Sequence, residues 1–261
     1  MALEPRTYEG FVATLEENGS ITIRVSRKTK KELVAIRRVV DQILTPGQRE
    51  LDITVIFDSH NSLVIAEDFE ELGVAKLNIT FILKAHVHLE YICFVIDSDR
   101  STLASNRLRS SVNQSVSDYT KTIRYVFAEP GASLTSRTVY FVGRKRNFKL
   151  TTIQDHQAPQ TTSSLIVKSA LEGEVSFTCD DLIRIHKDAQ KVVAQQSNKN
   201  LLLSSQARAT SVPKMEVEAD DVSCKHGSAT SKPHPDQLFY LQSRGLEVGF
   251  VIELLIQSLF K

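Results

Sequence analysis

The sequence lacks the features that mark several common classes of protein. It has no tryptophan, and its net charge is only +1 over 261 residues. A balance this even gives no electrostatic basis for binding nucleic acid or an anionic membrane surface. No run of 18 or more apolar residues is present, so the sequence predicts no transmembrane helix. The first residues, MALEPRTYEG, also lack the basic and apolar regions of a secretory signal peptide.

Cysteine is scarce as well. The three cysteines, Cys93, Cys179 and Cys224, lie far apart in the sequence. Disulfide-stabilised secreted domains carry a much denser set of cysteines. The sparse thiols therefore indicate a reducing compartment, which predicts a cytoplasmic protein, or one of the plastid stroma if the source is a plant or alga. We expect Cys93 and Cys179 to be buried in the core, as free cysteines usually are.

The motifs of common catalytic sites are absent too. There is no Walker A loop, no Gly-x-Ser-x-Gly nucleophile motif and no His-Glu-x-x-His zinc motif. His86 and His88 would share one face of a strand, but no third metal ligand lies near them in the sequence. The acidic pairs Asp180-Asp181 and Asp220-Asp221 are more typical of turns or sheet edges than of catalytic carboxylates. The sequence therefore predicts that the protein is not an enzyme.

What the sequence does contain is a long series of short apolar segments rich in Val, Ile and Leu. Many short strands of this kind are typical of an all-β sandwich, barrel or β-helix. The expected strands include Ile21–Val25, Ile53–Phe57, Ser62–Ala66, Leu77–Leu83, Val87–Ile96, Thr138–Val142, Leu165–Val167, Val175–Phe177, Leu182–Ile185, Leu201–Leu203 and Met215–Ala219.

Several segments interrupt this series. Arg27–Leu44 has apolar residues at helical spacing, and Pro46-Gly47 would end such a helix, but its valines and isoleucines also permit a strand. Ser98–Ser117 is polar and rich in Ser, Arg and Asn, which predicts a loop. Ser197–Asn200 predicts a turn, and Lys225–Pro235 predicts a connector.

The C-terminal residues change to a helical pattern. Arg244-Gly245 predicts a break between two helices, because glycine is common just after a helix ends. The apolar positions that predict two amphipathic helices are Leu238, Phe239, Leu241, Val248, Val251, Ile252, Leu255, Ile256 and Leu259.

The stretch Pro213–Gly245 carries the residues of greatest chemical interest. It opens with a strand-like alternation and then places Cys224 and His226 two residues apart, so both side chains would project from one face of a strand. Iron favours thiolate and imidazole donors, although a lone Cys-x-His pair is weak evidence for a metal site. A thiolate needs a lowered pKa, which we expect Lys225 or a bound metal to supply.

This stretch resembles the C-terminal signature of the SufB/SufD family, the scaffold components of an iron–sulfur cluster assembly machine. The matching residues are Pro213, Glu216, Ala219-Asp220-Asp221-Val222, Cys224, His226-Gly227, Asp236-Gln237-Leu238-Phe239-Tyr240-Leu241 and Ser243-Arg244-Gly245-Leu246. A second block resembles SufD in Ala189-Gln190-Lys191, Ala194, Gln196, Asn198 and Asn200-Leu-Leu-Leu-Ser204, and a third, weaker block comprises His156, Pro159, Thr161, Ser163 and Lys168.

The resemblance implies a fold and a role. It implies a right-handed parallel β-helix core over residues 21–225, after a lead-in of residues 1–20 and before a connector and helical segment of residues 226–261. It favours a strand at Arg27–Leu44. The chain looks closer to SufD than to SufB, which implies a non-catalytic scaffold subunit. Its partners would be a SufB-type subunit and a SufC-type ATPase, with ATP hydrolysis belonging to the ATPase.

The resemblance also implies the site residues. His226 first, and Cys224 second, would hold transient iron or a transient iron–sulfur cluster at the interface with the SufB-type subunit, with no permanent cofactor. The C-terminal helices would dock the ATPase in the helix-in-groove manner. The apolar anchors for that contact, which could equally pack on the chain's own core, are Leu255, Ile256, Leu259 and Phe260.

One alternative function follows from the expected fold alone. Carbohydrate-active hydrolases and lyases often use a parallel β-helix. Such an enzyme needs carboxylates clustered on one face of the coils. The sequence offers no convincing set of these, so the scaffold interpretation is the stronger of the two.

Overall fold

Most strands whose burial is described are built by an alternation that buries one face and leaves the other at least partly exposed. In β8 (Asp118–Phe127) every second side chain from Tyr119 to Phe127 is buried, and the residues between them are more exposed. Successive side chains of a strand point to opposite faces, so a strand of this pattern covers a core with one face.

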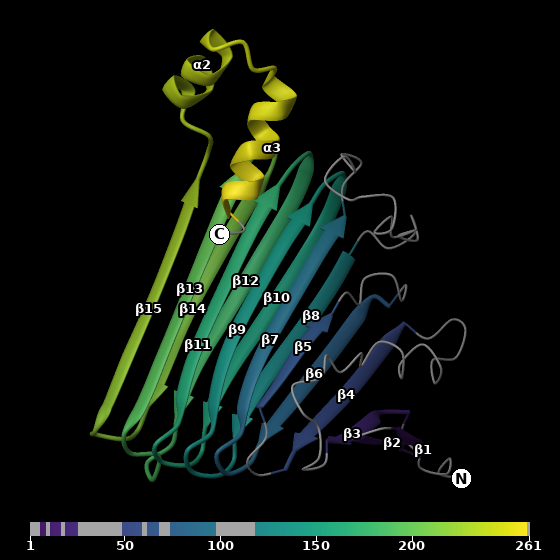
Figure 1. The fold of residues 1–261 in the computed structure, drawn as a ribbon, viewed down its shortest axis with the longest axis vertical. Coiled ribbons are helices and arrows are strands. Elements are labelled where there is room, and N and C mark those ends of the chain that lie inside the picture. Colours follow the sequence, from purple (N-terminus) through teal and green to yellow (C-terminus); the bar gives the residue numbers. More distant parts are fainter. Residues whose placement is uncertain are drawn as a thin grey trace.

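In a computed structural model, these strands form a parallel β-solenoid of about five turns, followed by two short helices (Figure 1). The structure describes residues 6–8, 11–16, 19–25, 49–58, 62–67, 74–97 and 118–259. The elements predicted at Arg27–Leu44 and Ser98–Ser117 lie outside the described residues. The expected all-β core with short C-terminal helices is confirmed.

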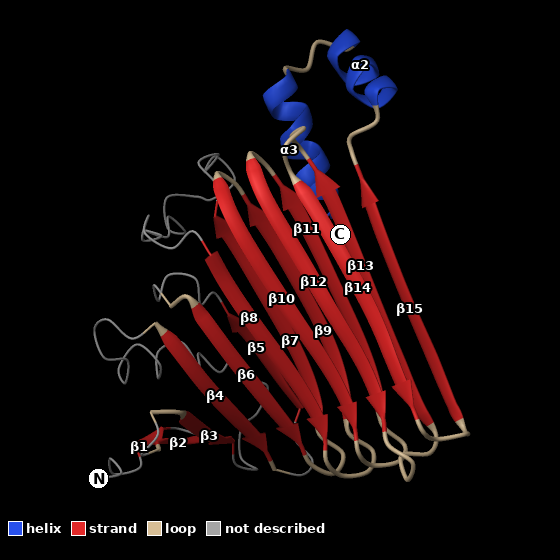
Figure 2. Ribbon diagram, turned by 180° about the vertical axis from the view of Figure 1, so that it is seen from behind, coloured by secondary structure: helices blue, strands red, loops and turns tan. Residues whose placement is uncertain are grey.

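The chain alternates between two sheets from β4 onward (Figure 2). The nine-stranded sheet A contains, in order, β1 (Arg6–Tyr8), β2 (Phe11–Leu15), β3 (Ile21–Val25), β4 (Glu50–Phe57), β6 (Lys76–Leu83), β8, β10 (Lys145–His156), β12 (Glu174–Ile185) and β14 (Arg208–Val217). The six-stranded sheet B contains, in order, β15 (Val222–Ser231), β13 (Val192–Leu202), β11 (Thr162–Leu171), β9 (Ser133–Val142), β7 (His88–Asp97) and β5 (Ser62–Glu67). All pairings are parallel except β1 with β2 and β2 with β3.

The strands are longer than the apolar segments that predict them. β11 runs from Thr162 to Leu171, whereas its apolar run is only Leu165–Val167. The strand extends further because polar residues such as Ser164 and Lys168 occupy outward positions and small hydroxyl residues such as Ser163 and Ser169 occupy inward ones. For the same reason the turn predicted at Ser197–Asn200 is wrong: these residues lie within β13.

Like residues stack on one another from coil to coil. Tyr119, Phe148 and Phe177 lie 29 residues apart along the chain and side by side in register. Their ring centroids are 5.1 and 5.3 Å apart, with the rings nearly parallel. Offset stacks of this kind add to the free energy gained by burying the rings.

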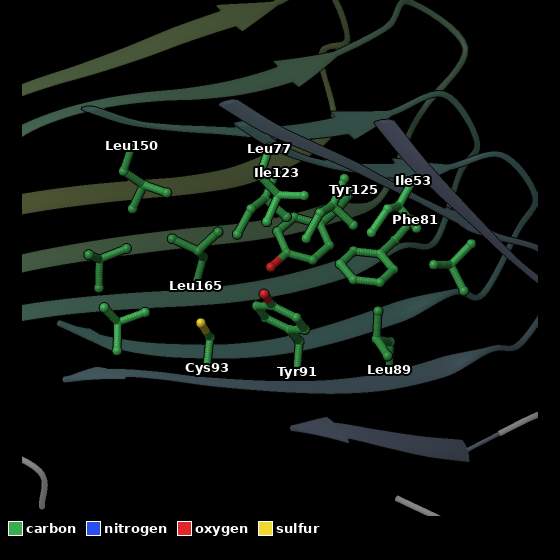
Figure 3. Close-up of a cluster of buried hydrophobic side chains, with 14 of the residues drawn as sticks. Ile53, Leu77, Phe81, Leu89, Tyr91, Cys93, Ile123, Tyr125, Leu150 and Leu165 are labelled. Atoms are coloured by element: carbon green, nitrogen blue, oxygen red, sulfur yellow. The ribbon is translucent and has the colours of Figure 1, made fainter. Parts of the chain in front are cut away.

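Large side chains fill the interior of the earlier coils (Figure 3). The rings of Phe81, Tyr91 and Tyr125 are fully buried, with centroids 5.2–6.1 Å apart. The Tyr125 hydroxyl forms a hydrogen bond of 3.0 Å with the Ser136 hydroxyl, so this buried polar group has a partner. Cys93 lies among these residues, fully buried, and Cys179 is buried further along, as predicted.

A residue in the left-handed backbone conformation occupies the same turn of successive coils. Such residues have φ between 57° and 74° at His86, Gly131, Gln160 and Lys191. The N–H of each donates to the turn of the next coil at 2.6–3.4 Å, with acceptor carbonyls at Pro130, Pro159, Gln190 and Asp221. These bonds join the turns into a continuous column.

Two local predictions are corrected by the structure. His86 and His88 do not share a strand face, because His86 forms a turn and only His88 lies in β7. The connector predicted at Lys225–Pro235 is mostly strand, since β15 continues to Ser231. The lead-in contains β1 and β2, which form an antiparallel unit with β3.

Two helices follow β15, as predicted. α2 (Pro235–Ser243) begins after His234, whose ring accepts the Asp236 N–H, and the chain turns at Gly245 with φ +86° before α3 (Val248–Leu259). α3 packs on the outer face of sheet B, where Ile256 contacts Phe141 and Ala170.

The turn at Gly173 provides a test of how closely the turns of neighbouring coils pack on one another. Gly173 has φ +76°, and a Cβ there would lie 2.5 Å from the Arg144 carbonyl oxygen. We expect Gly173→Ala to lower the free energy of unfolding by about 1–3 kcal/mol, measured by urea denaturation. Gly227→Ala is the control, because a Cβ at Gly227 has no atom within 4 Å. Equal effects of the two substitutions would contradict the argument.

Candidate functional site at the open end of the solenoid

The C-terminal coil ends the solenoid with two unpaired strand edges. β14 is the last strand of sheet A and β15 is the last strand of sheet B, and no further strand of the described residues pairs with either. We call this region the open end. Its inward-facing side chains from β15 are half-buried or exposed, because no coil follows to cover them.

Cys224 lies on the inner face of β15, at the margin of a small apolar cluster. It is half-buried and packs with Val222 against that cluster. Burial raises the pKa of the Cys224 thiol, so the thiol is protonated at neutral pH. The expectation that Lys225 lowers this pKa is wrong, because adjacent residues of a strand point to opposite faces.

His226 lies two residues further along β15, on the same face, as predicted. It is exposed, and its register neighbour on β13 is Gln196, whereas Cys224 lies beside Ala194. The strand thus places a thiol in a partly apolar setting and an imidazole in a polar one. Among the described residues, no group of three or more His, Cys, Asp or Glu side chains could hold a metal ion.

A buried acid lies behind this pair. Asp181 is 1% exposed and accepts hydrogen bonds from the Thr152 hydroxyl and from the Cys179 thiol at 3.2 Å, and the Gln196 amide lies beside it. Burial raises the pKa of Asp181, and the hydrogen bonds oppose that shift. The prediction of Asp180-Asp181 as turn or edge charges is wrong: both lie within β12, and Asp180 pairs with Lys214. The sequence did contain a signal for the burial of Asp181, because this residue continues the alternation of buried positions in β12.

His156 is a structural residue, as expected. Its two ring nitrogens bond the hydroxyls of Thr161 and Ser163 at 2.7 and 2.9 Å, and its ring stacks on Phe127. Burial lowers the pKa of His156 to about 3, with Asp155 acting in the opposite direction. The ring is therefore neutral at physiological pH.

The predicted anchors of the C-terminal helix lie mostly against the solenoid. Ile256 is 1% exposed, and Leu259 packs on the same cluster with Ile256. Leu255 is half-buried, and Phe260 lies outside the described residues. The large apolar side chains that remain exposed on the described part of the two helices are instead Phe239, Tyr240, Val248 and Phe250.

Comparison with known families identifies the fold unit. A family model described as "SUF system FeS cluster assembly, SufBD core domain" matches residues 52–258. The chain belongs to the SufBD family. The match includes the open end and both C-terminal helices, so the candidate site lies inside the shared SufBD core.

Several relatives of known name share this SufBD core. An iron–sulfur cluster assembly SufBD family protein of Mycobacterium leprae is 32% identical over 142 residues, which are 51% of this chain and 36% of the relative. A SufBD family protein of Synechocystis is 42% identical over 100 residues, 38% of this chain and 22% of the relative. The iron–sulfur cluster assembly protein SufD of Escherichia coli is 25% identical over 200 residues, 77% of this chain and 39% of the relative. The chain thus spans less than two fifths of each of these proteins.

Three aspartates of β10 and β12 lack the arrangement that a carbohydrate-active enzyme would need. Asp180 and Asp181 point to opposite faces of β12, so they cannot act together on one bond. Asp155 is fully occupied by Arg124, by Gln157 at 3.1 Å and by His186 at 2.9 Å.

No helix of the described residues is long and apolar enough to cross a membrane.

The low pKa of His156 predicts an acid-sensitive fold. The unfolded chain takes up this proton near pH 6.5 and the folded chain only near pH 3, so stability falls as pH drops through that window. We expect wild type to lose about 2 kcal/mol between about pH 6.5 and about pH 5 that His156→Gln does not lose, measured by urea denaturation. Parallel stability curves for the two proteins would show that His156 is not the titrating group.

Proposed function

We propose that this SufBD chain is a SufD-like, non-catalytic scaffold subunit that helps build and transfer a transient iron–sulfur cluster. The cluster is cargo of the complex and has no permanent place in this subunit. The observation that carries the proposal is the placement of Cys224 and His226, side by side on the last strand of a SufBD core. The names of the relatives, which include a SufD, support the same role.

The partner in this proposal is a SufB-type subunit that pairs with the open end. Unpaired strand edges are ready to bond another chain, and proteins usually cover or charge them. β14 instead exposes apolar side chains: Val212 is 38% exposed, Met215 45% and Val217 44%. A second solenoid that continues both sheets would bury these side chains and satisfy the edges, and it would bring its own ligands to Cys224 and His226.

The chemistry of the pair suits a transient cluster. Iron–sulfur clusters are commonly held by four protein ligands, and this subunit supplies two. The Cys224 thiol must lose its proton when it binds iron, because burial keeps it protonated in the free subunit. His226 can offer one ring nitrogen while the other is protonated. A half-complete ligand set releases its cargo more readily than a closed one.

The second partner in this proposal is a SufC-type ATPase, which would dock on the C-terminal helices. α2 has no buried residue, and Phe239 and Tyr240 on it are 74% and 57% exposed. Val248 and Phe250 at the start of α3 are 49% and 50% exposed. We name these four residues the helix patch. They replace Ile256 as the contact residues, since Ile256 is buried against the chain's own sheet.

His226→Ala tests the cluster site. When the variant is co-expressed with SufB- and SufC-type partners, we expect the complex to form with several-fold less iron and sulfide and to transfer clusters poorly. Cys224→Ala should act in the same direction with a smaller effect, because His226 is the more exposed ligand. His88→Ala, an exposed histidine far from the open end, is the control and should match wild type. Wild-type iron content in a complex containing His226→Ala would refute the site.

The double substitution Phe239→Ala and Tyr240→Ala tests the helix patch. Exposed aromatic side chains frequently dominate binding energy, so the affinity for the ATPase should fall by about tenfold or more, measured by isothermal titration. Thermal stability should stay unchanged because neither side chain is buried. Val193→Ala, a 50% exposed apolar residue on β13, is the matched control. If the control weakens binding as much as the double variant, the ATPase binds elsewhere.

A further inference from the structure

The inner face of β13 carries three amides in a row, and each has a hydrogen-bonding side chain beside it on β15. The three amides are 5%, 1% and 2% exposed. We call the resulting three pairs the amide ladder. In parallel register they are Gln196 with His226, Asn198 with Ser228, and Asn200 with Thr230.

One rung of the amide ladder is formed in the structure. Asn200 Nδ2 donates to Thr230 Oγ1 at 3.2 Å, and Asn200 Oδ1 accepts from the Ser169 hydroxyl at 2.7 Å. The amide nitrogens of Asn198 and Asn200 also donate to Ser211 Oγ, at 3.1 and 3.2 Å. The amides of β13 are therefore fixed from sheet A as well as from their own sheet.

The other two rungs each have an acceptor without a donor. Gln196 Oε1 and Asn198 Oδ1 are buried and accept no hydrogen bond. A buried carbonyl in this state is rare, because it gives up its bonds to water without replacement. The register neighbour of Gln196 on the other side is Leu165, which has no donor. His226 is thus the neighbour in the same sheet that can supply an N–H.

Gln196 is anchored from behind by the buried acid. Its amide lies beside Asp181 and lowers the pKa of that acid, which accepts hydrogen bonds from Thr152 and Cys179. An amide favours a charged acid through its N–H end, which leaves the amide oxygen to bond another group. The orientation of the amide is therefore set inside the solenoid, independently of any partner at the open end.

We infer that Gln196 is a positioning residue for His226, with Gln196 Oε1 accepting the N–H of one ring nitrogen. A neutral imidazole carries one N–H and one unprotonated nitrogen, so a hydrogen bond to the first fixes the tautomer and presents the second to a ligand. Asp181 acts one step further back, by holding the Gln196 amide. The inference rests on the proposed role of His226 as a ligand of the transient cluster.

Gln196→Leu and Gln195→Leu form a matched pair for the test. Leucine removes the amide at similar size, and Gln195 lies on the opposite face of β13, where its amide donates to Ser164 Oγ at 2.9 Å. Two measurements are made on the full chain. The first is the tautomer of the His226 ring, from its nitrogen chemical shifts at about pH 8, above the ordinary histidine pKa of about 6.5. The second is the affinity for Fe²⁺ alone, titrated without oxygen.

We expect one tautomer to dominate in wild type and in Gln195→Leu. In Gln196→Leu we expect a mixture of both tautomers and an affinity for Fe²⁺ lowered about 10- to 100-fold, as is typical when a group that orients a metal ligand is lost. Identical ring spectra in the two variants would overturn the inference, whatever His226 does. A changed ring in Gln196→Leu, together with unchanged Fe²⁺ affinity in His226→Ala, would support the positioning and refute the ligand role.

Gln196→Glu keeps the test decisive if Gln196→Leu does not fold. A glutamate retains an acceptor oxygen at the same distance from the backbone, so the ring of His226 should keep its wild-type tautomer. A mixed tautomer in folded Gln196→Glu would show that the oxygen of residue 196 does not hold the ring. Circular dichroism spectra of each variant establish that the solenoid is intact before either measurement is interpreted.

Discussion

The column of left-handed turns is the constraint on which the rest of the structure depends. Strands can stack in register only if each coil reverses direction at the same place, and one residue per turn adopts positive φ to do so. Two of the four such residues in this column have charged or ionisable side chains, His86 and Lys191, and Gln160 is polar. Bonds to the next turn must therefore offset the conformational cost that glycine would avoid.

The sequence predicts the fold class well and the turns poorly. Alternation and β-branched residues are enough to predict strands, because a half-buried strand needs only an apolar residue at every second place. The strand ends are not predictable in this way: inward serines such as Ser163 and inward amides such as Asn198 interrupt the apolar pattern without interrupting the strand. His86 shows the converse. Its sequence context is typical of a strand, but the residue forms a turn, where its N–H bonds the Pro130 carbonyl of the next coil.

The shared strand face of the two candidate residues was predictable from the sequence, and their surroundings were not. The resemblance selected Cys224 and His226, and strand periodicity placed them on one face. Neither could reveal that Asp181 is buried behind them, because an Asp-Asp pair in a sequence usually indicates a turn. The register of β13 with β15 sets the amide beside the imidazole, and the packing of sheet A against sheet B sets the acid beside the amide. Contacts between residues 30 or more positions apart are set by coil length, which a sequence pattern does not fix.

The inner face of β13 changes along the strand, from Val192 and Ala194 to Gln196, Asn198 and Asn200. The two proposed ligands on β15 lie on either side of this change. Cys224 still borders the apolar cluster, so its thiol keeps its proton. His226 lies beside the first amide of β13, where the interior can accept hydrogen bonds. In a solenoid each coil is stabilised mainly by contacts with its neighbours. The last coil has a neighbour on one side only, and its polar inner side chains add little hydrophobic stabilisation. A partner that covered it with an apolar surface would leave these amides unsatisfied, which favours a partner whose own end is polar at the same level.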